Sequence, residues 1–220
     1  MSFVSRFFRA FVLVPTLFVA LSCSDYSPTT APIAAPTQTQ DGLLSGLLGL
    51  VTGLLGTVLK VVVGVVDPNG IEVRAAQWTP GHVNQVRSVS GTIGYNGGTL
   101  AIPGSDFTIT FPQGALTQST AITIISDGSG YVSYDMRPHG LTFAKPVLVT
   151  QKLRNTSLYG TPQVWNSFGA YFPQDPTILS GILKAVETTT TTIFAAPDGT
   201  APAIHVWQLR HFSRYMLASG

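Results

Sequence analysis

The most constraining feature of the chain is a series of short alternating runs that starts near residue 70 and continues to the C-terminus. In residues 107–111, which read FTITF, apolar side chains alternate with threonine, so one face of a strand would be buried and the other would meet water. Gly, Pro and Asn separate such runs, as is typical of an all-β sandwich or barrel. Comparable runs occupy residues 120–125, 131–136, 147–153, 164–172 and 203–217, and β-branched residues fill 188–192. We therefore expect an all-β fold with no helix of ordinary length after Val66.

Three motifs occur in order within this region. They are GGTL at residues 97–100, FTITFPQGAL at 107–116 and MRPHGLTFAKPVLV at 136–149. Together they resemble the ZU5 domain, a β-sandwich module of ankyrins, netrin receptors and death-domain scaffolds. The resemblance extends from about residue 93 to 215 and is weakest over 159–203. Because ZU5 domains bind other proteins and most catalyse nothing, it implies a ZU5-like antiparallel β-sandwich over residues 70–220, with an unidentified protein partner and no cofactor.

The N-terminus has the three parts of a secretory signal. Arg6 and Arg9 precede an apolar run over residues 11–21, which is too short to span a bilayer. The residues ALSC at 20–23 resemble a bacterial lipobox, in which the peptide before the cysteine is removed and the cysteine is lipidated. Leu21 lies one place nearer to the cysteine than lipoboxes prefer. We expect a lipoprotein-type signal peptide over residues 1–22 and lipidation at Cys23, the one cysteine of the chain; the alternative is an ordinary secretory signal.

Removal of this peptide changes the charge of the chain. Of 12 lysines and arginines, Arg6 and Arg9 would be lost, so 10 basic residues would remain against 10 acidic ones. A formal charge near zero gives no indication of nucleic-acid binding, and we expect none. The residues that follow, 23–41, are rich in proline and threonine and cannot bury enough apolar area to fold, so we expect a disordered tether.

Residues 42–66 are nearly all apolar and repeat internally. Their glycines step by four and three, which on a helix would align them along one face and allow another backbone to approach. As a helix the 25 residues would extend about 37 Å, enough to cross a hydrocarbon core of about 30 Å, with Lys60 near one end. We expect one apolar helix that contacts the membrane or associates with itself; the alternatives are a helix packed on the sandwich and an apolar linker. The aligned glycines are Gly42, Gly46, Gly49, Gly53 and Gly56.

Residues typical of catalysis or metal binding are scarce. His205 and His211 have the same strand parity, but an extended chain would place them about 20 Å apart, too far to share an ion. His82 and His139 have no neighbouring cysteine or paired carboxylate in the sequence. The sequence DGSG at 127–130 lacks the successive oxygen ligands of a calcium loop and is expected to form a turn. We therefore expect no metal site.

The large aromatic residues have a structural interpretation. Trp78, Trp165 and Trp207 are the largest candidates for the core or for a groove, and core packing is expected for each of them.

One tripeptide near the C-terminus suggests a self-cleavage reaction. Some ZU5-containing scaffolds cleave themselves between Phe and Ser in a His-Phe-Ser sequence, which occurs here as His211, Phe212 and Ser213. The serine hydroxyl would attack the preceding carbonyl, the peptide would rearrange to an ester, and water would release the C-terminal piece, with the histidine as base. The alternative is that these residues form only a closing strand of the sandwich.

Three functions are compatible with these observations. The first is a membrane-anchored, non-catalytic protein-binding or structural domain of the bacterial cell envelope, held in the outer membrane or at the cell surface, which would work through an exposed groove or strand edge. The second is a self-cleaving domain that acts through His211 and Ser213. The third is an assembly subunit, a homo-oligomer joined in the membrane through the glycines.

Overall fold

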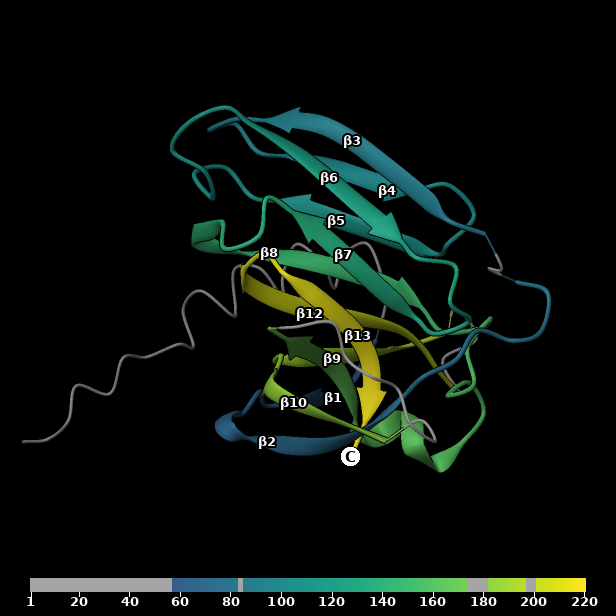
Figure 1. Ribbon diagram of the computed structural model, residues 1–220. Coiled ribbons are helices and arrows are strands. Elements are labelled where there is room, and N and C mark those ends of the chain that lie inside the picture. The colour runs from purple at the N-terminus through teal and green to yellow at the C-terminus, as the bar shows by residue number, and fades with distance from the viewer. Residues whose placement is uncertain (1–56, 83–84, 174–181, 197–200) are drawn as a thin grey trace, which may run out of the picture. The chain divides into compact units, whose positions relative to one another are not determined.

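The computed structural model describes residues 57–82, 85–173, 182–196 and 201–220, and these residues form two antiparallel β-sheets (Figure 1). The prediction of an all-β fold is confirmed. The first sheet, which we name sheet A, has six strands. Their spatial order is β1 (Val58–Val62), β11 (Thr191–Ala195), β12 (Pro202–His211), β8 (Thr142–Lys152), β5 (Phe107–Phe111) and β4 (Gly98–Ile102).

The second sheet, sheet B, has seven strands. Their order is β2 (Val66–Ala75), β10 (Ile182–Thr188), β9 (Ser167–Phe172), β13 (Arg214–Ser219), β7 (Ser133–Arg137), β6 (Thr120–Ser126) and β3 (Arg87–Ile93). Strand β2 pairs not only with β10 but also with β13, where Ala75 lies opposite Ala218. Strands β2, β10, β9 and β13 therefore form a closed ring at one end of sheet B, in which Arg74 and Ala75 of β2 pair with β13.

The main core lies between the two sheets and follows from the alternation in the sequence. Phe107, Ile109 and Phe111 of β5 point into it, while Thr108 and Thr110 point outward. Val147 and Val149 of β8 and Trp207 and Leu209 of β12 complete the inner face of sheet A. A second, smaller core fills the ring of four strands, with Val73, Phe168, Leu183 and Met216 among its buried residues.

The expected helix over residues 42–66 is wrong where the structure describes this segment. Residues from Val58 onward form strand β1 at the edge of sheet A and strand β2 in sheet B. The physical reason is composition: valines dominate residues 58–66, and β-branched side chains favour strands over helices. Lys60 donates a hydrogen bond from Nζ to Oδ1 of Asn166 at 2.9 Å. The sandwich therefore begins before residue 70. In the part of the chain with described positions, the one helix is the 3-10 helix η1 (Pro162–Asn166).

Other expectations were met in part. Residues 203–217 are not one strand: β12 belongs to sheet A and β13 to sheet B, with Phe212 and Ser213 between them. Residues 159–203, where the ZU5 resemblance is weakest, supply β9, β10 and β11 and so extend the sandwich. Trp78 and Trp207 are buried as expected, but core packing is wrong for Trp165, which lies on η1 with 38% of its surface exposed.

Candidate functional site

The tripeptide singled out in the sequence lies where the chain passes from one sheet to the other. His211 is the last residue of β12, and Arg214 is the first of β13. The backbone between them is hydrogen-bonded on both sides. Phe212 donates its N–H to the carbonyl of Leu141 at 2.8 Å, and its own carbonyl accepts the N–H of Gly140 at 2.9 Å. The Phe212 carbonyl, which self-cleavage would require Ser213 to attack, thus has one hydrogen-bond donor in place.

The side chain of Phe212 fixes this crossing in the main core. It is fully buried, and its ring packs edge-on against Phe143 with centroids 4.9 Å apart and against Phe111 with centroids 5.9 Å apart. Such edge-to-face pairs add about 0.5–1.5 kcal/mol beyond area burial. Ser213 is also buried, with 8% of its surface exposed. The tripeptide therefore has a strong structural role.

The imidazole of His211, on β12 of sheet A, contacts groups on three strands of sheet B. Its Nε2 lies 3.1 Å from Oε2 of Glu187, and the hydroxyl of Tyr215 lies 3.2 Å from the same nitrogen. The ring of Tyr171 packs against it edge-on at 4.8 Å. The hydrogen bond to Glu187 raises the pKa of His211 above its usual value, although partial burial acts in the opposite direction. A raised pKa favours the imidazolium form, so a smaller fraction of this histidine is neutral and able to accept a proton near neutral pH.

A small cavity adjoins this histidine cluster. It has a volume of about 280 Å³ and shares Glu187 with the cluster. Its lining is mostly polar and comes from three segments that are distant in the sequence. These are the connection from β1 to β2, the corner between β10 and β11, and β12, which supply Gly64, Val66, Thr188, Thr189, Thr190, Gln208 and Arg210 in addition to Glu187. Only one acidic and one basic side chain face the cavity, so it has no strong charge preference.

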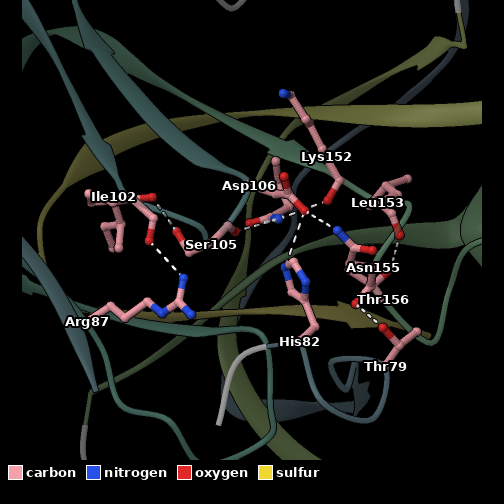
Figure 2. Close-up of polar contacts among 12 residues, drawn as sticks. Thr79, His82, Arg87, Ile102, Ser105, Asp106, Lys152, Leu153, Asn155 and Thr156 are labelled. Atoms are coloured by element: carbon pink, nitrogen blue, oxygen red, sulfur yellow. Dashed lines mark hydrogen bonds and ion pairs between the residues drawn. The ribbon is translucent and has the colours of Figure 1, made fainter. Parts of the chain in front are cut away.

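A second polar cluster surrounds Asp106 in the turn from β4 to β5 (Figure 2). Asn155 donates from Nδ2 to Oδ2 of Asp106 at 2.6 Å, and Nε2 of His82 lies 3.3 Å from the same oxygen. The backbone of Asp106 has a φ of 55°, a left-handed conformation that aspartate tolerates in turns. Asn155 in turn accepts the N–H of Thr79 at 2.9 Å. The cluster therefore connects three loops through hydrogen bonds and an ion pair, and we interpret its role as structural.

A third histidine is enclosed in the core. His205 and Ser167 are both fully buried, with the serine Oγ 3.1 Å from Nε2 of the histidine. The hydroxyl donates to the carbonyl of Val164 at 2.6 Å, so Nε2 is the donor to Oγ. Burial lowers the pKa of His205 to about 3. A serine and a histidine in contact resemble the start of a nucleophilic site, but both side chains are closed to solvent and no substrate could reach them.

The partners of two histidines were missed at the sequence level. His82 contacts Asp106, and His139 contacts Asp135, although the sequence shows no paired carboxylate beside either histidine. The spacing of four residues between Asp135 and His139 gave no signal, because it brings side chains together on a helix, and Asp135 lies on β7 with His139 in the turn after it. Hydrogen bonds from His139 and Arg137 lower the pKa of Asp135 despite its partial burial.

Over the described ranges, no three of His, Cys, Asp and Glu come together in a way that could hold a metal ion. The sequence DGSG forms a turn, in which Asp127 accepts the N–H of Ser129 at 2.9 Å.

Four exposed valines lie along the chain from the end of β1, through its connection to β2, to the start of β2. Val61, Val63, Val65 and Val66 are 44%, 73%, 54% and 74% exposed. The backbone of this connection is held firmly: Val65 donates its N–H to Oγ1 of Thr188 at 2.9 Å, and its carbonyl accepts the N–H of Thr188 at 2.8 Å. Ordered backbone with solvent-facing valines is typical of a surface that contacts a partner. We name these four residues the valine strip.

The remaining predicted site residues lie outside the described residues. These are Cys23 and the five glycines Gly42, Gly46, Gly49, Gly53 and Gly56, together with the signal peptide and the tether. Among the residues that the structure describes, no helix is long and apolar enough to cross a membrane.

Comparison with known proteins gives no family assignment. No protein-family model matches the chain, and no curated protein matches it. The ZU5 resemblance therefore stays a prediction that rests on the three sequence motifs.

Proposed function

We propose that this protein is a membrane-anchored, non-catalytic binding or structural domain of the bacterial cell envelope, attached through a lipid on Cys23 and presented on the tether of residues 23–41. The valine strip is the observation that carries the proposal. Four solvent-facing valines on a hydrogen-bonded segment form an apolar surface that a partner can cover. A binding domain uses such a surface directly, whereas the buried serine and histidine in the core offer nothing to a substrate.

The ZU5 resemblance supports the same proposal. Its motifs contact one another: the N–H of Ala144 donates to the carbonyl of Ala115 at 3.0 Å, and Gly98 lies opposite Phe111 in the pairing of β4 with β5. Gly97 has a φ of 75° and lies against the carbonyl of Phe111. Motif residues that support one another's backbone are expected of a sandwich signature, and family members with this signature bind proteins.

The anchor is tested by the intact mass of the protein extracted from membranes of a bacterial host, beside a Cys23→Ser variant. The proposal expects a chain that starts at Cys23 and carries diacylglyceryl mass, and a variant that leaves the membrane fraction. A wild-type chain that keeps residues 1–22, or that starts elsewhere without lipid, would refute the anchor.

The binding surface is tested by a photo-crosslinking amino acid placed at Val63 or Val65 in cells. We expect discrete adducts from these positions and none from Ser88, an exposed residue on the far edge strand β3 that serves as the control. Equal labelling from Ser88 would contradict a specific role for the valine strip. Self-cleavage at Ser213 and assembly through the five glycines remain alternative hypotheses.

A further inference from the structure

The outer face of sheet A carries an apolar patch that points away from both cores. Phe194 on β11, Val206 on β12 and Leu148 on β8 have strand parity opposite to the core residues Ile193, Trp207 and Val149. Val58 and Ile204 pack beside them. We name these five residues the outer patch.

Three residues of the outer patch are shielded from solvent, while Val58 and Ile204 are partly buried. Phe194 is 0%, Val206 4% and Leu148 6% exposed. All described strands belong to the two sheets, so no described strand is stacked on this outer face. The side chains on an uncovered sheet face would be largely exposed, as Thr110 is on the same face of β5. The burial of the outer patch therefore requires a cover from elsewhere.

We infer that residues 42–56 of the same chain dock on the outer patch. This segment joins the sheet at the correct place, because the carbonyl of Thr57 accepts the N–H of Ala195 at 2.9 Å and Val58 lies opposite Phe194 in the ladder. The segment thus enters β1 directly beside the patch. Its length is also suitable: 15 residues would extend about 22 Å as a helix, while the four strands from β1 to β8 span about 14 Å.

As a helix, residues 42–56 would have one apolar face, and this face would match the apolar outer patch. At 100° per residue, Leu43, Leu47, Leu50 and Leu54 gather on one side, next to Leu44, Leu48, Val51 and Leu55. The glycines, with Ser45 and Thr52, occupy the opposite side. A segment with one leucine face suits a sheet surface, whereas a helix in lipid would be apolar all round. The docking is independent of the lipid at Cys23, so either idea can fail alone.

Cysteine pairs in the full-length protein test the docking directly. We expect Leu50→Cys with Val206→Cys to form an intramolecular disulfide, identified by mass in a non-reducing digest that also reports on Cys23. Thr52→Cys with Val206→Cys is the matched control, since residue 52 would face away, and it should stay reduced. A disulfide between two chains would instead identify a second copy as the cover and overturn the inference.

A second measurement does not depend on disulfide geometry. Val206→Cys should react slowly with a thiol reagent, and adding Leu47→Asp with Leu54→Asp should speed the reaction by about tenfold or more, because the cover would open. Ser45→Asp with Thr52→Asp, on the other side of the segment, should leave the rate unchanged. Equal rates in all three backgrounds, or labelling of residues 42–56 by a reagent confined to the bilayer, would refute docking in favour of membrane contact.

Discussion

Ser167 Oγ lies 3.1 Å from Nε2 of His205 between the two sheets, and neither side chain is accessible to solvent. The histidine thus donates to the serine while its own Nδ1 is buried with no hydrogen-bond partner among the described residues. A protonated imidazole would place an uncompensated charge in the core, which explains the low pKa. This pair therefore makes the fold sensitive to acid rather than catalytic.

The first prediction concerns this acid sensitivity. The pKa of His205 is about 3 in the folded chain and about 6.5 when unfolded, so the unfolded state binds the extra proton between these values. The free energy of unfolding attributable to this group is constant above pH 6.5 and falls as the pH decreases, by about 2 kcal/mol at pH 5. Denaturant unfolding at pH 7 and pH 5 measures it. The His205→Gln variant, which does not titrate, should lose less stability over this interval; the same loss in both proteins would contradict the prediction.

The second prediction concerns His211, whose pKa moves in the opposite direction. Because the contact with Glu187 raises the pKa of His211, its contribution to stability is fully present below pH 6.5 and is lost as the pH rises through the folded pKa. Glu187→Gln should lower the pKa of His211, measured by its imidazole proton shift in NMR, and should reduce stability by up to about 1 kcal/mol in acid but less at pH 8. Asp127→Asn, a distant carboxylate change, should leave the His211 titration in place.

The third prediction separates backbone strain from close packing at two glycines. Gly97 and Gly140 share a φ of 75°, but a Cβ on Gly97 would lie 2.1 Å from the Phe111 carbonyl, whereas nothing lies within 4 Å of one on Gly140. Gly140→Ala should cost about 1–2 kcal/mol for the left-handed conformation alone. Gly97→Ala should cost clearly more, since the turn before β4 must also move. Thermal or denaturant unfolding of both variants decides the point, and equal losses would show that the turn relaxes freely.

The fold could be predicted from the sequence where alternation was strict. Residues 107–111 form β5 within the expected bounds, because period-two burial is read directly from FTITF. Residues 203–217 were expected to be one alternating run, but the chain changes sheets after His211. The core-facing residues are spaced by three rather than two at the crossing, from Leu209 to Phe212 to Tyr215. The glycine repeat of residues 42–56 predicts a helix only as far as it extends, and the valines at 58–66 follow their own strand preference.

The contacts of the candidate site could not be predicted. Glu187 and His211 are separated by 24 residues in the sequence. They meet because β10 belongs to sheet B and β12 to sheet A, and the two sheets pack against each other. Asp106 reaches His82 and Asn155 through turns whose mutual positions depend on the whole sandwich. The motif His-Phe-Ser was visible in the sequence, but the direction of the imidazole was not.

The last prediction decides between the two roles of that motif. Self-cleavage predicts that the wild-type chain loses residues 213–220 on incubation and that Ser213→Ala abolishes the loss. The contacts favour the closing-strand role: the imidazole is bonded to Glu187, Phe212 is locked between Phe111 and Phe143, and β13 pairs with β7, β9 and β2.

We therefore expect an intact chain after long incubation at pH 7. Intact mass must be read under denaturing conditions, because a cleaved β13 would remain paired in the sheet. Glu187→Gln offers a further check: it frees the imidazole and lowers its pKa, so a latent cleavage reaction should accelerate in this variant. An eight-residue loss that requires Ser213 in either background would establish the chemistry and make the motif a self-cleavage site. Intact chains in both backgrounds would assign it to the sandwich alone.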